Sequence, residues 1–169
     1  MPKYIRIDER LIHGQILQKW LEYTCCNIIY VIDDEVAEDP ITQSVLAMTV
    51  PAKVQVEFLD ERSGAKRIRE TKDTVMILLK SLETLQRLFE LGVRTERVNV
   101  CRLPYAPGKK MICQNLFISD REEEILRRII REGIDICIQT VPDNDEIHMK
   151  DLLPERAEGR REAWREEQS

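Results

Sequence analysis

The stretch Asn27-Ile28-Ile29-Tyr30-Val31-Ile32-Asp33 indicates the class of fold, because its five central residues are all apolar. A strand that is apolar on both faces is typical of a parallel sheet covered by helices on each side. Thr74 to Leu79 is a second stretch of this kind, while Lys3 to Asp8 and Lys53 to Leu59 alternate as half-buried strands do. We therefore expect several strands that lie inside a layered domain.

Helical patterns separate these strands. Gln15 to Tyr23 has an apolar helical face, and Asp39-Pro40 is typical of a helix start. Leu82, Leu85 and Phe89 form the apolar stripe of another helix, which Gly92 would end. A capping box at Ser119 and Glu122 predicts a further helix, which carries Ile125, Leu126, Ile129 and Ile130 and would end at Gly133. Further strands are expected at Arg97 to Cys101, within Met111 to Ile118 and at Asp135 to Val141. This alternation predicts an α/β fold: an open, mostly parallel twisted sheet with helices on both faces, doubly wound in three layers.

The chain of 169 residues divides by composition into one domain, residues 1–154, and a charged C-terminal tail, residues 155–169. The tail carries nine charges, five acidic and four basic, and Trp164 is its one large apolar side chain. Two interpretations stay open. The tail is either a solvated, frayed end or a helix that docks on a partner.

Overall charge and motifs exclude several classes of function. The formal net charge of −5 offers no general attraction to nucleic acid, and no apolar run is long enough to span a bilayer. The N-terminus lacks the apolar core of a signal peptide, so we expect a cytoplasmic protein. No phosphate-binding loop of the nucleotide type is present, and His148 has no cluster of metal ligands around it, so neither a cofactor nor a metal is expected.

The segment Asp8-Glu9-Arg10-Leu11-Ile12-His13-Gly14-Gln15 is the most informative for function. It falls where the first strand ends and the first helix begins, which is the edge where open parallel sheets bind ligands. The helix start offers free backbone N–H groups to a phosphate. Gly14 allows close approach of the backbone to a ligand and relaxes the local φ/ψ limits, and Arg10 supplies a permanent cation that can grip phosphoryl oxygens.

A histidine in this position is a candidate nucleophile toward phosphorus. Its neutral imidazole attacks, and the surrounding donors stabilise the oxygens of the transferred group. The alternative is that His13 is an ordinary surface histidine at a helix start. The neighbouring Arg10 and Gly14 keep the functional interpretation open beside it.

The stretch Ile7-Asp8-Glu9-Arg10-Leu11-Ile12-His13-Gly14-Gln15 closely resembles the signature I-D-x-R-L-I-H-G-Q. This is the signature of the IIB component of the mannose/fructose/sorbose family of the sugar phosphotransferase system (PTS). Asp33 to Pro40, Pro107 to Lys110 and Ile138 to Pro142 also resemble segments of that family, in the same order. The resemblance covers roughly residues 3 to 150.

The resemblance implies that the chain is a phosphocarrier, a protein-phosphohistidine–sugar phosphotransferase. His13 stands where the family histidine accepts a phosphoryl group from the phosphorylated IIA protein and passes it to a sugar of the mannose/fructose/sorbose class. The sugar is imported by a membrane IIC/IID pair, which would also bring the chain to the inner face of the membrane. Arg10 is expected to hold the phosphoryl group, together with Gly14 and Gln15.

Three further residues are expected to support the site. Asp8 orients Arg10 or the loop, and Lys80 is either at the border of the cleft or a solvated lysine at a strand end. Arg102 lies in Cys101-Arg102-Leu103-Pro104-Tyr105, where the family usually has small residues. Either Arg102 adds a second cation near the phosphoryl site, or the bulk of this segment alters which partner fits. This departure and the charged tail keep one alternative open: a regulatory phosphorelay protein whose phospho-His13 state is sensed by a partner without sugar transport.

Overall fold

The computed structural model describes residues 3–154, and their strands form a mostly parallel sheet. Its strands are β1 (Lys3–Asp8), β2 (Ile28–Ile32), β3 (Gln55–Leu59), β4 (Val75–Leu79), β5 (Arg97–Arg102), β8 (Asp135–Ile138) and β9 (Ile147–His148). The order across the sheet is β3-β2-β4-β1-β5-β8-β9, and only β9 pairs antiparallel to its neighbour. The predicted mostly parallel sheet is therefore confirmed.

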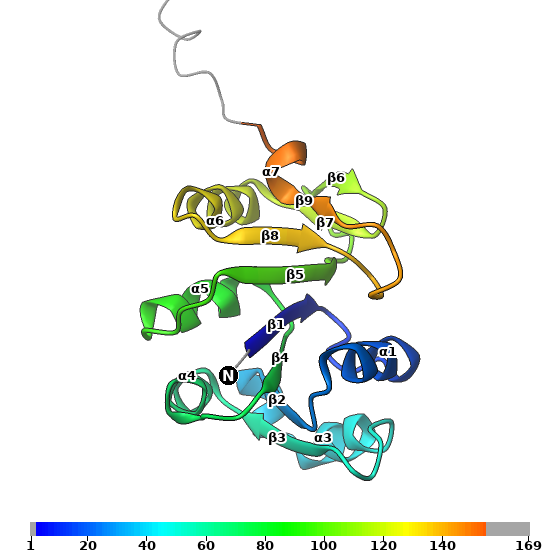
Figure 1. The fold of residues 1–169 in the computed structure, drawn as a ribbon. Helices are drawn as coiled ribbons and strands as arrows, with labels where there is room; N and C mark the ends of the chain where they lie inside the picture. The colour runs from blue at the N-terminus through cyan, green and yellow to red at the C-terminus, as the bar shows by residue number, and fades with distance from the viewer. Residues whose placement is uncertain (1–2, 155–169) are drawn as a thin grey trace, which may run out of the picture.

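Helices cover both faces of this sheet, as Figure 1 shows. The helices are α1 (Gly14–Thr24), α2 (Asp34–Ala37), α3 (Pro40–Ala47), α4 (Glu61–Glu70), α5 (Leu82–Glu90), α6 (Asp120–Arg131) and α7 (Met149–Leu152). Apolar side chains of α4 to α7 pack with one face, and those of α1, α2 and α3 pack with the other. The three-layer, doubly wound arrangement agrees with the prediction. None of the helices within residues 3–154 is long and apolar enough to cross a membrane.

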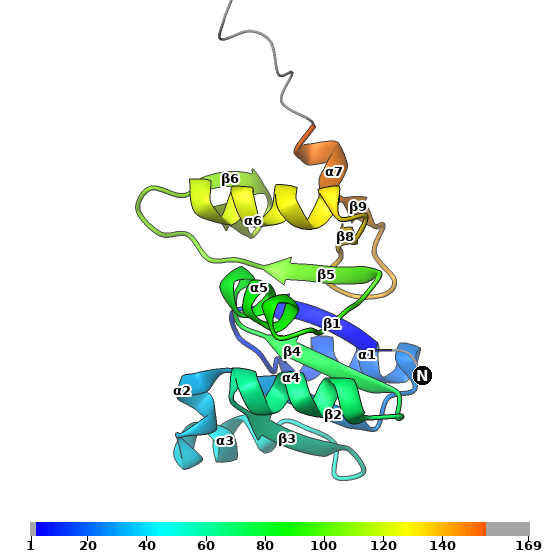
Figure 2. The same ribbon diagram turned by 90° about the vertical axis from the view of Figure 1, so that its left-hand side faces the viewer.

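Several functional candidates share one edge of the sheet, the edge formed by the carboxyl ends of the parallel strands. Figure 2 shows α2, α3, the loop after β1 and the long loop after β5 along this edge, with the N-terminus at the opposite edge. In the strand register, Asp8 at the end of β1 pairs with Arg102 of β5. On the other side of β1, Ile7 pairs with Leu79, the residue before Lys80.

One close contact holds α4 against the sheet. Gly64 of α4 faces Ile32 of β2, and a Cβ at Gly64 would lie 2.7 Å from the Cδ1 atom of Ile32. Ile32 is fully buried, so it has little room to move away. A glycine is therefore required here by packing, and it lets the helix approach the strand closely.

The structure corrects the prediction in the second half of the chain. The expected strand within Met111 to Ile118 is an antiparallel hairpin of β6 (Lys110–Cys113) and β7 (Leu116–Ile118), outside the main sheet. The hairpin turns at Asn115, whose φ of +63° is left-handed. The last parallel strand ends at Ile138 and not at Val141, because the side chain of Gln139 binds the backbone oxygens of Pro142 and Asn144 in a turn.

Three short elements and one longer helix escaped sequence analysis. The helix α4 is rich in charge, and only Gly64, Ala65 and Ile68 are buried, so it lacks a recognisable apolar stripe. The strand β9 and the helices α2 and α7 are too short to leave a periodic pattern. The predicted charged tail, residues 155–169, lies outside the described residues.

The segment Lys109-Lys110, which follows Gly108, is tied to the start of α6. Lys109 Nζ lies 2.9 Å from Glu122, and Lys110 Nζ pairs with Glu123. Arg127 also binds Glu123, through its Nε at 2.8 Å. Hydrogen bonds from Lys110 and Arg127 outweigh the opposing effect of burial and lower the pKa of Glu123 to about 2. These pairs join the hairpin to α6.

We predict that Gly64→Ala lowers the free energy of unfolding by about 1–2 kcal/mol, because overpacking against Ile32 outweighs the higher helix propensity of alanine. The variant Ile32→Val removes the nearest atom, Cδ1, and costs about 1 kcal/mol alone. Denaturant unfolding of the double variant should show a smaller loss than the sum of the two single losses. Additive losses would contradict the proposed contact.

Acid stability provides a second test. The pKa of Glu123 falls from 4.5 to about 2 on folding. Its stabilising contribution is therefore complete above about pH 4.5 and is lost as the pH falls toward 2. We expect Glu123→Gln to lower the free energy of unfolding at pH 7 by about 2–3 kcal/mol and to flatten its dependence on pH in that range. Glu124 is an exposed neighbour, so Glu124→Gln is the control and should keep the wild-type slope of unfolding free energy against pH. If Glu123→Gln also has the wild-type slope, the assignment to Glu123 is wrong.

Candidate functional site

The loop between β1 and α1 exposes His13 on a backbone that buried neighbours hold. Leu11 and Ile12 are buried in the core of the α1 face, whereas His13, the next residue, is exposed. Leu11 has a left-handed φ of +57°, and its N–H donates to the backbone oxygen of Asp8 at 2.9 Å. The left-handed residue of this loop is therefore Leu11 and not Gly14, where the sequence suggested relaxed φ/ψ limits. The two buried side chains hold the loop while His13 faces solvent.

His13 is the N-cap residue of α1. Its backbone oxygen accepts from the N–H of Leu17, but its side chain makes no capping hydrogen bond. The first N–H groups of a helix have no partner inside the helix. The N–H groups of Gly14 and Gln15 therefore lie at a helix start next to the imidazole, with the positive end of the helix dipole. This arrangement can hold an anion.

Arg10 is held by Asp8 at the end of β1. Its Nε and Nη2 atoms donate to the two oxygens of Asp8 at 2.9 and 2.8 Å, and its backbone N–H donates to Oδ1 at 3.0 Å. Burial alone would raise the pKa of Asp8, but these hydrogen bonds outweigh it and lower the pKa. The same hydrogen bonds raise the pKa of Arg10. Asp8 is thus an ionised, buried carboxylate that fixes the Arg10 guanidinium.

The fork to Asp8 uses one edge of the Arg10 guanidinium, the edge that includes Nε. A guanidinium has five N–H donors, and Nη2 also donates to Cys101 Sγ, so the two N–H groups of Nη1 remain for another acceptor. Cys101 lies beside this group, with its Sγ 3.9 Å from Nη2. Cys101 is buried, and burial raises the pKa of its thiol. Arg10 can therefore stay bound to Asp8 while its other edge binds an oxyanion.

Arg102 and Lys80 lie at the same sheet edge, and each has a carboxylate partner. Arg102 Nε lies 2.6 Å from Glu9, while Lys80 Nζ lies 3.9 Å from Glu35. The pair of Lys80 and Glu35 is exposed and long, so it holds Lys80 weakly. Glu9 binds Arg102 next to the His13 loop, which keeps this second cation at the site.

Sequence reasoning missed the carboxylates that bind two of the predicted cations. Glu9 follows Asp8 directly, but its partner Arg102 is far along the chain, so nothing local signals the pair. The register of β1 with β5 shifts at Asp8, which faces Arg102 and leaves Cys101 as an extra residue. Such irregularities change the direction of the side chains at the end of a strand, and no sequence pattern predicts this one.

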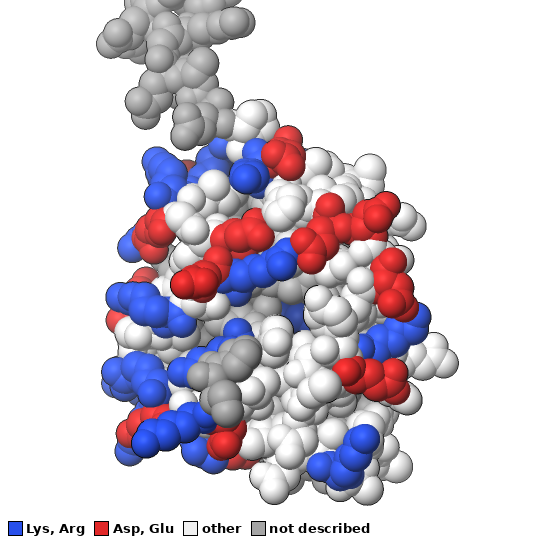
Figure 3. Space-filling model, viewed as in Figure 1, with Lys and Arg blue, Asp and Glu red and all other residues white. Residues whose placement is uncertain are grey.

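The surface near His13 is poor in charge on one side. Residues 40–52, which form α3 and the turn after it, contain no Asp, Glu, Lys or Arg, whereas blue and red side chains gather over α4 to α6 in Figure 3. The residues of this region meet the site directly: the Cβ position of Gly14 lies 3.7 Å from the Cβ and backbone oxygen of Thr49, just after α3. At that distance an alanine at position 14 makes an ordinary contact. Gly14 is therefore not required by the protein's own packing.

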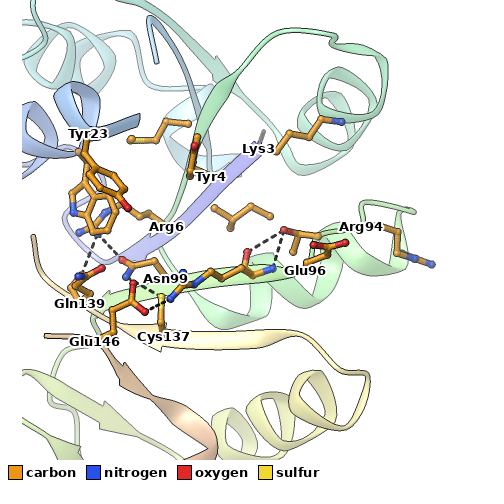
Figure 4. A pocket seen from close by; sticks show the side chains of 15 residues that line it. Lys3, Tyr4, Arg6, Tyr23, Arg94, Glu96, Asn99, Cys137, Gln139 and Glu146 are labelled. Atoms are coloured by element: carbon orange, nitrogen blue, oxygen red, sulfur yellow. Dashed lines mark hydrogen bonds and ion pairs between the residues drawn. The ribbon is translucent and has the colours of Figure 1, made fainter. Parts of the chain in front are cut away.

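A hollow of about 540 Å³ lies elsewhere on the α1 side, over β1, β5 and β8. Figure 4 shows Arg6, Asn99, Gln139 and Glu146 around it. Burial lowers the pKa of Arg6, whose guanidinium lies 4.7 Å from the centre of the Trp20 ring and donates to Asn99 and to backbone oxygens. None of the predicted site residues lines this hollow. Arg6 is bonded to Asn99 and Arg97 to Glu146, while the side chain of Gln139 binds backbone oxygens, so these polar groups already have partners within the protein.

The fold and the edge site define an α/β protein with an exposed histidine at a helix start, in the same loop as an arginine held by a buried carboxylate. The chain belongs to the PTS system sorbose subfamily IIB components, whose sequence pattern matches residues 3–163. The predicted family resemblance is therefore confirmed. Membership places the chain in the phosphotransferase system that serves sugar transport.

Individual relatives agree with this assignment. The N-acetylgalactosamine-specific phosphotransferase enzyme IIB component 2 of Escherichia coli (strain K12) is 31% identical over 157 residues, which are 90% of this chain and 100% of that protein. The mannose-specific EIIAB component of the same strain is 28% identical over 151 residues, 88% of this chain and 47% of that protein. The chain thus spans about half the length of the EIIAB relative. These sugar-specific names do not favour the regulatory alternative.

A solved structure confirms the fold independently. The IIBSor domain of the sorbose permease from Klebsiella pneumoniae is similar with a TM-score of 0.85 and 21% identity. The likeness covers 94% of this chain and 99% of that domain. The three-layer α/β architecture is therefore shared.

Proposed function

We propose that His13 carries a phosphoryl group from a phosphorylated IIA protein to a sugar of the mannose/fructose/sorbose class, held by a membrane IIC/IID pair. The observation that carries this proposal is the exposed imidazole of His13 at the start of α1, in the same loop as the Arg10 guanidinium that Asp8 holds. Family membership supports it, since the relatives are sugar-specific phosphotransferase components. The chain would work at the cytoplasmic face of the membrane.

The first step is an attack by the unprotonated ring nitrogen of His13 on phosphorus. A nitrogen–phosphorus bond forms, and the bond between phosphorus and the donor breaks. The free edge of Arg10 and the N–H groups of Gly14 and Gln15 stabilise the charge on the equatorial oxygens. In the second step the oxygen of a sugar hydroxyl attacks phosphorus, the bond to His13 breaks, and the hydroxyl proton is taken up by the released imidazole nitrogen.

Other residues act around this centre. Asp8 is a positioning residue, because it reaches the phosphoryl group only through Arg10. Arg102 adds positive charge at the edge, but Glu9 offsets most of it. We assign Lys80 the most distant role, since it lies one strand away from Asp8 and faces Glu35.

We expect incubation with phosphorylated IIA to place an acid-labile, base-stable phosphoryl group on wild-type protein and none on His13→Ala. The chain has one other histidine, His148, whose Nδ1 lies 2.8 Å from Asp135. His148→Ala is therefore the matched control and should incorporate phosphate as the wild type does. Intact mass and phosphorus NMR measure the incorporation. Equal incorporation in all three proteins would falsify the assignment of His13.

The two arginines at the site should differ in their contribution. Arg10→Ala should slow single-turnover phosphoryl transfer from IIA by about 10- to 1000-fold, because it removes donors aimed at developing charge. Arg102→Ala should slow transfer by less than about tenfold, since Glu9 already compensates its charge. Rapid-quench measurement of His13 phosphorylation gives both rates. A larger loss with Arg102→Ala than with Arg10→Ala would reverse the assigned roles.

A further inference from the structure

The helix α3 and the turn after it lack charged side chains. Residues 40–52 contain no Asp, Glu, Lys or Arg, although such residues make up 34% of the chain. Soluble proteins usually cover exposed helices with charge, and an uncharged, apolar surface often marks an interaction site. The uncharged stretch is therefore unusual for its position at the surface.

One side of α3 faces the protein and the other carries large apolar side chains into solvent. On the inner side, Leu46 packs against the core and Gln43 donates to backbone oxygens of α2. On the outer side, Ile41, Val45 and Met48 are 78%, 60% and 84% exposed. Their spacing of four and three residues places them on one helical face. We call these three side chains the α3 stripe.

The α3 stripe lies next to the candidate histidine. Met48 is followed by Thr49, whose Cβ is 3.7 Å from the Cβ position of Gly14, and Gly14 follows His13. The helix α3 has eight residues, which span about 12 Å. A standard protein interface covers about 800 Å² on each partner, a disc of roughly 16 Å radius. A protein that covers His13 would therefore also cover the stripe.

We propose that the α3 stripe is the docking surface for the phosphorylated IIA protein that donates to His13. This inference rests on the proposed function, because it needs His13 to be the acceptor. Donor and acceptor atoms must come into contact, so the donor surface has to lie over the start of α1 and the end of α3. A IIA unit is the partner named within the EIIAB relative, where it shares a chain with a IIB unit.

The size and chemistry of the stripe suit such a donor. Three apolar side chains form a small centre that loses water on contact, and few residues normally carry most of the binding energy. A small centre gives a transient complex, which a carrier needs because the donor must leave before the sugar site can reach His13. We therefore expect the IIA surface opposite the stripe to be apolar, with its phosphoryl group beside it.

The test uses charges that preserve the helix. Ile41→Glu lies in the first turn and Met48→Lys at the C-terminal end, where each charge is favourable to the helix dipole. Both side chains are exposed, so folding should be unaffected, which circular dichroism checks. The matched control is Tyr23→Lys, at a residue of α1 that is 68% exposed and lines the distant hollow. Met48→Leu is the conservative variant and should keep wild-type behaviour.

Two phosphoryl donors separate docking from chemistry. With phosphorylated IIA from the same organism, the Ile41→Glu/Met48→Lys variant should show a KM at least tenfold higher and a kcat within about twofold of wild type. With phosphoramidate, a small donor that needs no docking surface, His13 should react at the wild-type rate in every variant. Tyr23→Lys should match wild type with both donors.

The other outcomes overturn the proposal in distinguishable ways. An unchanged KM for IIA shows that the stripe does not bind the donor. An unchanged KM with loss of sugar phosphorylation in IIC/IID membranes assigns the stripe to the membrane partner, and an unchanged KM with loss of a dimer in light scattering assigns it to a second copy of this chain. If neither donor phosphorylates wild-type His13, the proposed function fails first.

Discussion

The buried carboxylate of Asp8 constrains the rest of the site. It stands at the end of a central strand, where the register with β5 shifts, and it binds both the side chain and the backbone N–H of Arg10. A buried ionised carboxylate needs such partners to offset its lost hydration. One interaction thus orients the guanidinium and starts the turn that leads through Leu11 to His13. Movement of Arg10 away from β1 would break these hydrogen bonds.

Two ion pairs of different strength flank the carrier histidine. The pair of Asp8 and Arg10 is buried on its acidic side and bidentate, while the pair of Glu9 and Arg102 is more exposed. Each carboxylate offsets a cation, so the site keeps donors for oxyanions without a large local charge. A carrier has to release its phosphoryl group as readily as it accepts it, and a strong net positive charge would hold that group. The uncharged α3 stripe next to the site offers a partner apolar contact area and no charge.

The sequence predicted the fold well because its strands are apolar and its helices start with clear caps. Asp39 and Ser119 cap α3 and α6 as expected. The helices α2 and α7 and the strand β9 were missed, and the hairpin was taken for one strand, because a short element has no period; α4 was missed because close approach through Gly64 replaces an apolar stripe. At the site, the motif correctly marked the edge and the helix start. It did not predict the partners of Arg102 and Lys80, because tertiary pairs between distant segments have no local signature.

The central claim is that Asp8 and Arg10 act as one unit in phosphoryl acceptance. A double-mutant cycle with Asp8→Asn and Arg10→Lys tests it most directly, with the single-turnover rate of His13 phosphorylation by IIA as the readout and the melting temperature as a check on folding. The account predicts that both single variants are slow and that the double variant is no slower than the slower single one. Multiplicative losses, with the double variant slower by the product of the two effects, would show that the two residues act independently and would contradict the account.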